Sequence, residues 1–359
     1  MPTLSLYSST PKLVVGGQEM LAAREDLLSL SVDEDIWGMS SLEARLINVP
    51  RDRTSRNYPY LDRGTFDFGA EVTVSLGPAH DETELFAGRI SALSASFTEA
   101  EAVTFSFCAE DRLQDFRLAR RTRTFSDVST ADIAESLAAD HGLTPSIDLD
   151  GPTRRVVNQL NLSDLAFLRD LARADGAEVW LDGGGLHLQR RVDRDVGTVT
   201  LSYGASLSAF HVTADLAHQV SDVAVTGWSV ADKDVIEETA DSGDLGAELA
   251  GGDSSGSDVL AEALGERHER LVLAEPLTTE DARGRAKAAY LERARRFVTG
   301  TGVTDGTPGL RVGSRVAIDR LGDLFSGEYR VVRTSHRFDL VNGYGTEFDV
   351  ERVGIGAVS

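Results

Sequence analysis

Residue patterns that support catalysis in other proteins are scarce in this sequence. Residues 252–256 (GDSSG) match the G-x-S-x-G pattern, in which the serine, here Ser254, is a nucleophile. That chemistry needs a strand before the serine and a helix after it to hold the serine in a strained turn. Here the surrounding residues are glycine, serine and acidic side chains, which are typical of a loop. We therefore expect the match to be fortuitous.

Metal-ligating patterns are equally weak. His268-Glu269 lacks the second histidine that a zinc protease places on the next helical turn. Cys108 is the single cysteine, which excludes an intrachain disulfide and a cysteine-ligated metal. We expect His336 to be a packed or hydrogen-bonded residue. The sequence thus predicts no catalytic residue, no cofactor and no bound metal.

Charge narrows the range of partners. The 359 residues include 36 Lys and Arg against 58 Asp and Glu, for a formal net charge of -22. So acidic a protein is a poor ligand for nucleic acid or for an anionic membrane, and we expect neither as a partner. Within it, four basic residues form a cluster that indicates either a solvated face or a contact with an acidic surface of another subunit. They are Arg117, Arg120, Arg121 and Arg123.

Most of the sequence has the pattern of β-strands, so strands are expected to position most of the side chains discussed above. The sequence alternates apolar and polar residues over many segments, for example 71–76, 103–107 and 198–203. Residues 179–188 predict a hairpin that turns at the glycines 183–185. Three stretches have helical period instead. Their expected caps and ends are Ser129 or Thr130 to Gly142, Ser163 to Gly176, and Thr278 or Thr279 to about Phe297.

One acidic stretch differs from the rest. Residues 229–262 contain ten acidic side chains and one base, Lys233, around a Gly-Ser-rich centre. Composition predicts a mobile acidic loop that is dispensable for folding, with a regulatory or partner-binding role as the alternative.

The two ends of the chain share a pattern. Residues 68–74 (FGAEVTV) align with 312–318 (VGSRVAI), and 85–90 (LFAGRI) align with 324–329 (LFSGEY) after a shorter connection. Each copy predicts a strand, a turn and a long strand that feeds a hairpin, and such a unit cannot bury its apolar face alone. We expect two copies of one fold. The expected anchors, buried and superposable in pairs, are Phe86 with Phe325 and Gly88 with Gly327.

Residues 158–172 (NQLNLSDLAFLRDLA), with Gly176 and Trp180 after them, resemble the "xSDxxFLRxLA…G…W" segment of the phage late control gene D proteins. Those proteins are similar to the hub portion of type VI secretion valine-glycine repeat proteins. Residues 223–228 (VAVTGW) resemble the V-x-V-x-G-aromatic strand of the same family. Residues 308–336 resemble its closing "G…F-x-G-x-Y-x-V…H" strands.

The resemblance, over roughly residues 65–352, implies a mainly β fold with an α+β insert and two tube-like β-barrels. The expected divisions are a first barrel at 1–115, a helical and hairpin insert at 116–200, and a second barrel at 201–359 that carries the acidic loop. The resemblance therefore implies a structural baseplate hub of a contractile injection machine: a phage tail, a tailocin or an extracellular injection system.

Three chains with two barrels each would form a pseudo-sixfold ring between a hexameric inner tube and a trimeric spike. The implied partners are two further copies of the chain, the inner tube protein, a separate spike protein and baseplate wedge proteins. Assembly would take place in the bacterial cytoplasm, since no secretion signal is visible, and the product is a tail-like particle that is retained or released.

The uncharged C-terminal segment is either a frayed end or a strand that pairs with the spike chain. Its candidate contact residues are Val353, Gly354, Ile355, Gly356, Ala357 and Val358. Two other functions compete with the hub: a tail-tip cell-wall hydrolase, which would need room for its own acid/base module, and a stand-alone β-rich binding module, which would be monomeric.

Overall fold

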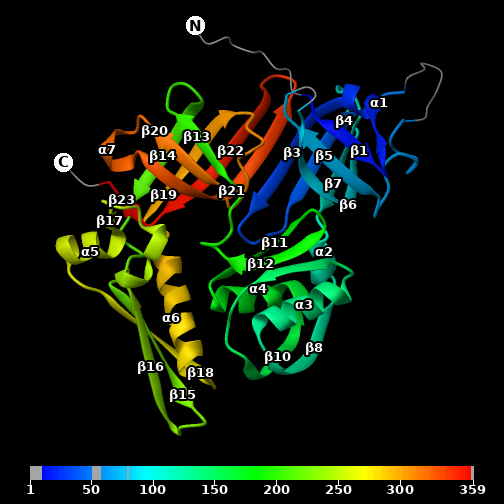
Figure 1. Ribbon diagram of the computed structural model, residues 1–359. Helices are drawn as coiled ribbons and strands as arrows, with labels where there is room; N and C mark the ends of the chain where they lie inside the picture. The colour runs from blue at the N-terminus through cyan, green and yellow to red at the C-terminus, as the bar shows by residue number, and fades with distance from the viewer. Residues whose placement is uncertain (1–9, 51–57, 79–80, 357–359) are drawn as a thin grey trace.

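The structure is a computed structural model that describes residues 10–50, 58–78 and 81–356. A broad β-sheet spans one side of the molecule, and two smaller α+β units extend from it side by side (Figure 1). The fold is mainly β with an α+β insert, as the sequence predicted. None of the helices in the described ranges is long and apolar enough to cross a membrane.

In the described residues the broad sheet has 13 strands, and its longest path runs β14-β19-β22-β21-β3-β4-β7-β6-β5-β1-β2, with β20 and β13 attached beside β21. The alternating sequence explains these strands, because one face of each packs on a core and the other is polar. Their bounds are β1 Lys12–Val15, β2 Gln18–Glu19, β3 Leu27–Asp35, β4 Ser41–Ile47, β5 Glu71–Leu76, β6 Thr83–Ser96, β7 Thr104–Glu110, β13 Thr198–Ser202, β14 Leu207–Ala214, β19 Val298–Asp305, β20 Arg315–Asp319, β21 Gly327–Asp339 and β22 Gly343–Arg352.

The sheet consists of two halves with the same topology. In the first half, the strands β1, β3, β4, β5, β6 and β7 lie in the order β3-β4-β7-β6-β5-β1. In the second half, the strands β13, β14, β19, β20, β21 and β22 lie in the order β14-β19-β22-β21-β20-β13. Strand for strand, the two orders are the same. One difference is that β1 is antiparallel to β5, whereas β13 is parallel to β20.

The two halves are joined into one sheet, and the division of the chain into two barrels stays a prediction. Strand β3 of the first half pairs antiparallel with residues 333–339 of β21 in the second, so one sheet runs through both. Each half nevertheless keeps its own hydrophobic core. The first is built around residues such as Phe66, Phe105 and Phe107, and the second around Phe297, Tyr329 and Phe348.

The repeat that the sequence suggested is real in topology but misaligned by two residues. Phe86 lies opposite Val74, while the corresponding Ile318 lies opposite Gly327. Phe86 therefore corresponds to Gly327, and Gly88 corresponds to Tyr329. A shift of two residues keeps every side chain on the same face, so alternation could not reveal it.

The predicted burial of both phenylalanine rings is wrong for one of them. Phe86 is buried in the first core, but Phe325 is half-buried at the end of the short helix α7 (Gly322–Phe325). Tyr329 takes the buried aromatic position in the second half, where its ring lies edge-on to Phe210.

The first smaller unit follows the first half of the sheet and has its own core, from Leu113 to Leu188. Both of its predicted helices are confirmed, with Ser129 and Ser163 as their N-caps, and so is the glycine hairpin. Gly183 and Gly184 have positive φ, which the two-residue turn requires. The elements are α2 Leu113–Arg117, β8 Arg120–Val128, α3 Thr130–Asp140, β9 Thr144–Asp148, β10 Arg154–Ser163, α4 Asp164–Ala174, β11 Ala177–Asp182 and β12 Gly185–Arg190.

The second smaller unit interrupts the second half between β14 and β19, where the first half has only the short turn from β3 to β4. Its long helix α6 begins after Thr278, as predicted, and packs on a three-stranded sheet. The elements are β15 Asp222–Ser229, β16 Asp234–Asp241, β17 Ser254–Ser255, α5 Gly256–Leu264, β18 His268–Pro276 and α6 Thr279–Ala294.

The expected acidic loop, residues 229–262, is therefore wrong. The segment holds a full strand, a capped helix and the buried side chains Ile236, Ala240 and Leu260. Its charges mislead because they alternate with apolar residues: Glu237 and Glu238 follow Ile236, whose side chain packs in the core that α6 covers.

Candidate functional site

The two halves meet at a seam, where β3 pairs with residues 333–339 of β21. Glu34 of β3 lies in this seam and accepts several hydrogen bonds. The Arg311 Nε lies 2.8 Å from Glu34 Oε1, and the Val312 N–H and the Thr334 hydroxyl donate to Glu34 Oε2 at 3.3 Å. Burial acts to raise the pKa of Glu34, but the Arg311 guanidinium outweighs it and leaves that pKa below its usual value. The seam is thus closed by a partly buried ion pair as well as by strand pairing.

His336 lies next to this ion pair and is fully buried. Its Nε2 donates to the Leu310 carbonyl oxygen at 2.9 Å, so the neutral ring must accept from the Tyr344 hydroxyl at Nδ1, also at 2.9 Å. Burial lowers the pKa of His336 to about 4, which keeps the ring neutral at pH 7. His336 is a hydrogen-bonded residue, as predicted.

The four arginines of the basic cluster have partners within the chain. Arg117 pairs with Glu110 at 2.5 Å, and Arg120 donates to the carbonyl oxygen of Asn161. Contact with another subunit stays a prediction for all four, but three of them already form ion pairs inside the chain. The remaining pairs join Arg121 and Arg123 to Asp140 and Asp164, at 3.2 and 3.5 Å for Arg121 and 2.7 Å to both for Arg123.

Asp164 is the centre of that network and belongs to the Ser-Asp motif that carries the family resemblance. Its side chain is only 2% exposed. Besides the arginines, it accepts a hydrogen bond from Gln159 at 2.8 Å and contacts His141 at 2.9 Å. Burial opposes ionisation, but these donors win and leave the pKa of Asp164 below its usual value. The motif therefore holds α3, α4, β8 and β10 together.

The C-terminal segment lies against the acidic stretch. Strand β23 (Gly354–Ile355) pairs antiparallel with β17, and the Gly356 N–H donates to the Leu324 carbonyl oxygen. Arg352 forms a buried ion pair with Asp253 at 2.5 Å. Val353 and Gly354 are buried, Ile355 and Gly356 are half-buried, and Ala357 and Val358 lie outside the described residues. Contact with a spike stays a prediction, but Val353–Gly356 is not a frayed end.

The Gly-Asp-Ser-Ser-Gly segment is built into this contact. Ser254 pairs with Ile355 in the strand, while Ser255 caps α5 through the Asp258 N–H. A helix does follow the serine, contrary to our expectation of a loop. However, Ser254 is not among the described non-glycine residues with positive φ, so the strained turn of a nucleophile elbow is not formed.

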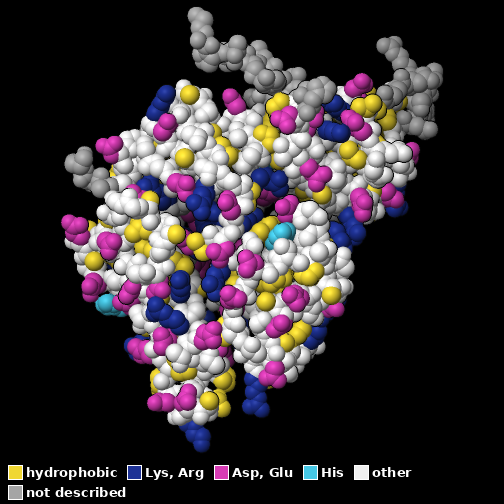
Figure 2. Space-filling view, viewed as in Figure 1, with side chains coloured by type: hydrophobic (Ala, Val, Ile, Leu, Met, Phe, Trp, Pro, Cys, Tyr) yellow, Lys and Arg dark blue, Asp and Glu magenta, His cyan; other side chains and the backbone are white. Residues whose placement is uncertain are grey.

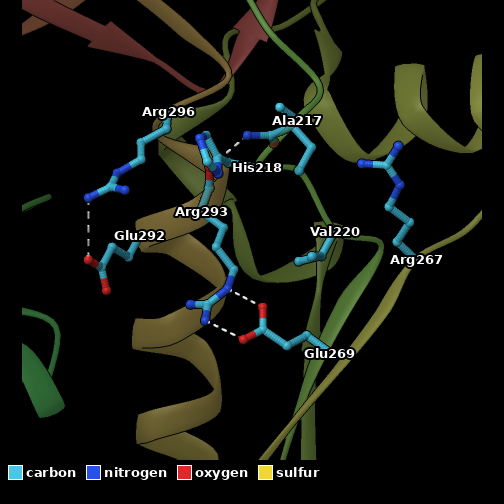
Figure 3. A pocket seen from close by; sticks show the side chains of 9 residues that line it. Ala217, His218, Val220, Arg267, Glu269, Glu292, Arg293 and Arg296 are labelled. Carbon is cyan, nitrogen blue, oxygen red and sulfur yellow. Dashed lines mark hydrogen bonds and ion pairs between the residues drawn. The ribbon is translucent and has the colours of Figure 1, made fainter.

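A groove of about 420 Å³ lies beside α6 (Figure 3). Its two carboxylates are engaged by arginines. Glu269 accepts from Arg293 through both oxygens at 2.5 Å, and Glu292 lies 3.8 Å from Arg296. Within the described ranges, no group of three or more His, Cys, Asp or Glu side chains is placed to hold a metal ion. Most of the charged side chains that line the groove therefore pair with one another.

Basic side chains gather where the sheet meets the two smaller units (Figure 2). Arg191 lies 3.7 Å from Glu178 of β11 and 2.8 Å from Glu351 of β22, so it ties the two strands together, and Arg194 also pairs with Glu178 at 3.0 Å. Within the second unit, Arg295 pairs with Glu248 at 2.6 Å, and Arg352 of β22 joins that unit to the sheet through Asp253.

The sequence analysis did not predict these ion pairs or the Glu34–Arg311 pair. The signal for Glu34 was the alternation Leu30-x-Val32-x-Glu34, which puts a carboxylate on the buried face of a strand.

Comparison with known proteins identifies the family. The sequence model described as the Alg8 N-terminal domain matches residues 7–339. The chain belongs to the Alg8 N-terminal domain family. No curated protein matches this Alg8 N-terminal domain chain at a significant level.

Solved structures share the fold of this Alg8 N-terminal domain over nearly its whole length. The 43 kDa tail protein of prophage MuSo2 from Shewanella oneidensis has a TM-score of 0.71 at 15% identity, over 96% of this chain and 98% of that one. A tail protein from Neisseria meningitidis has a TM-score of 0.68 at 14% identity, over 97% and 98%. A type VI secretion system component from E. coli has a TM-score of 0.60 at 12% identity, over 97% and 79%. The fold of phage tail and type VI proteins that the motifs predicted is confirmed.

Proposed function

We propose that this chain is a structural hub subunit in the baseplate of a contractile injection machine, where three copies form the ring between inner tube and spike. The observation that carries the proposal is the duplicated sheet. Two halves with one topology give each chain two equivalent wall segments, and three chains then supply six. The whole-length similarity to tail proteins supports the same role.

The internal construction suits a part that bears load. The two halves are joined by strand pairing and by the partly buried Glu34–Arg311 pair, and the smaller units are tied to the sheet through the Arg191–Glu351 and Arg352–Asp253 pairs. Antiparallel ladders and buried ion pairs resist separation, because breaking a buried pair leaves a charge uncompensated.

Catalysis is the weaker alternative. The carboxylates of the groove beside α6 are paired with arginines, and Ser254 lies in ordinary strand pairing. A hydrolase would need a free acid/base pair at a distance suited to its substrate. A peptidoglycan zymogram tests this alternative, and a clearing zone that Ser254→Ala abolishes would revive it.

The direct test of the hub is the mass of the particle and its shape. Light scattering at physiological salt should give three times 38.6 kDa, and negative-stain views down the axis should show a ring with six wall segments. Each chain carries -22 charges, so low salt should weaken the trimer by repulsion. A monomer at high protein concentration in moderate salt would overturn the proposal and favour a stand-alone binding module.

Partner binding is the second test. Co-expression with the tube protein and the spike protein from a contractile machine of the same host should yield a complex that survives gel filtration, and baseplate wedge proteins should bind its outer side. An isolated trimer that binds neither tube nor spike would contradict the adaptor role.

A further inference from the structure

Two of the open edges of the sheet lie at β14 and at residues 92–96 of β6. In the ranges that the structure describes, no strand lies beside β14 on the side away from β19. Likewise, none lies beside residues 92–96 of β6 on the side away from β7, since β5 pairs only with residues 83–89. An open edge presents unpaired N–H and C=O groups that accept a further strand.

These edges lack the usual protection. Natural sheets block open edges with charged side chains, lysine above all, or with proline. Residues 92–97 (ALSASF) contain no charged residue, and residues 207–214 (LSAFHVTA) contain none except a histidine. In a chain that is 26% charged, two such stretches on open edges indicate that something covers them.

The seam inside the chain shows what such edges accept. Strand β3, which pairs with β21 across the seam, occupies in the first half the place that β14 occupies in the second. Strand β21 occupies the place of β6. The chain therefore already makes, between its own halves, the strand pair that the edges at β14 and β6 would make between copies.

The correspondence extends to individual residues, because each pair of strands has a bulge at the same point. The ladder of β6 and β7 shifts between Ile90 and Ala92, and that of β21 and β22 shifts between Val331 and Arg333. Val331 lies opposite Val350 as Ile90 lies opposite Ala109, so Ala92 corresponds to Arg333.

The edge strands β3 and β14 match in the same way. The ladder of β3 and β4 shifts between Leu27 and Ser29, and that of β14 and β19 shifts between Leu207 and Ala209. A bulge pins the register of its strand. The matching bulges therefore fix which residue of each open edge corresponds to which residue of the seam, and the register between β3 and β21 can be applied to the open edges directly.

We infer that β14 of one copy pairs antiparallel with residues 92–98 of the next copy, in the register of the seam. The inference rests on the proposed ring and adds the edges and the residues that close it. The seam pairs Asp33 with Ser335 and Leu30 with Phe338. The corresponding pairs between copies are Ala214 with Leu93, Thr213 with Ser94, Val212 with Ala95, His211 with Ser96 and Phe210 with Phe97.

The pairing accounts for an exposed aromatic side chain. Phe97 is 62% exposed in the single chain, where its ring meets only one other described ring, that of Tyr58, edge-on. Its counterpart Phe338 is 9% exposed because Leu30 of the neighbouring strand packs against it. Phe210 of the next copy would cover Phe97 in the same way, since opposite side chains in a ladder lie close enough to pack.

Disulfide trapping tests the register. In a Cys108→Ala background, Ser94→Cys and Thr213→Cys are made in separate proteins, both at exposed positions. Mixed and mildly oxidised, the two should give a covalent dimer that neither forms alone. Side chains directly opposite are near the Cβ separation that a disulfide needs.

The matched control is Ser94→Cys mixed with His211→Cys. His211 lies on the same face as Thr213 but one diagonal step away, where Cβ atoms are too far apart. It should give at most about a tenth of the product. Phe97→Ser provides a second measurement: the subunit should fold normally, and its association should weaken about tenfold or more.

The outcomes separate this inference from the proposed function. A trimer by light scattering with no Ser94–Thr213 product, or with the control pair forming faster, would overturn the strand pairing and leave the hub intact. A chain that stays monomeric and never cross-links would overturn both.

Discussion

His336 and Asp111 should give the stability of this protein two opposite dependences on pH. His336 is buried with its pKa lowered to about 4 from an ordinary 6.5. Asp111, at the end of β7, accepts the N–H groups of Ser40 and Leu113, yet burial raises its pKa to about 7 from 3.8. Each difference between folded and unfolded pKa makes the free energy of unfolding change with pH.

The signs follow from which state binds more protons. Below about pH 6.5 the unfolded chain protonates His336 while the folded chain does not, so this contribution falls as pH drops towards 4. Between about pH 4 and 7 the folded chain keeps a proton on Asp111 that the unfolded chain has lost, so that contribution falls as pH rises. From pH 8 to pH 5, His336 lowers the free energy of unfolding by about 2 kcal/mol and Asp111 raises it by about 2–3 kcal/mol. In the wild-type protein the two effects nearly cancel.

Single substitutions should separate the two contributions to the pH dependence of the free energy of unfolding. Urea unfolding followed by circular dichroism at pH 5, 6.5 and 8 gives the free energy of unfolding. Relative to wild type, His336→Gln should gain about 2 kcal/mol at pH 5 compared with pH 8, because its folded state no longer excludes a proton. Asp111→Asn should show the opposite change of about 2–3 kcal/mol. His218→Gln, at an exposed position, is the control.

Parallel stability curves for wild type and both variants would refute this reasoning. They would mean that neither group has a folded pKa far from its unfolded one. If His336→Gln does not fold, Asp111→Asn still tests the second slope by itself.

Further predictions concern packing and the tail. Phe86→Ala should destabilise the chain by about 3–5 kcal/mol, whereas half-buried Phe325→Ala should cost less, as urea unfolding of the two variants would show; equal losses would contradict the assignment of Tyr329 as the second anchor. Deletion of residues 249–258 should lower the melting temperature, because it removes β17, the cap of α5 and the partner of Arg352; an unchanged melting temperature in calorimetry would show that the segment is dispensable after all. Asp164→Ala should cost about 3–5 kcal/mol, since it leaves Arg123 and Gln159 without their buried acceptor, and Asp140→Ala, at an exposed position, should cost clearly less.

Local patterns predicted the helices and hairpins well. Ser129, Ser163 and Thr278 cap helices because each is followed by an apolar face of helical period, and that information lies within a dozen residues. The glycines of the β11–β12 turn are equally local. The mainly β class followed from alternation, which the strands of the sheet display throughout.

Features that depend on distant residues were not visible. The two-residue shift between Phe86 and Phe325 leaves the alternation unchanged, so only the strand register reveals it. The acidic stretch was taken for a loop because its charges dominate its composition, while Ile236 and Ala240 pack against elements far along the chain. The partners of the basic cluster, Asp140 and Asp164, come from other elements, so pairing could not be foreseen.

The bulges that both halves share also bear on how such a chain can have arisen. Between Ile90 and Ala92 the extra residue is Ser91, and between Val331 and Arg333 it is Val332, so the two halves keep the position of the bulge but not its residue. Deleting one residue from a regular part of either strand, by contrast, would turn every later side chain to the opposite face. If one ancestral gene segment was duplicated, its descendants could drift in sequence almost freely while insertions and deletions inside the strands were eliminated. Strand length and bulge position would then be the features that both halves inherit, and residue identity would show their common origin least clearly.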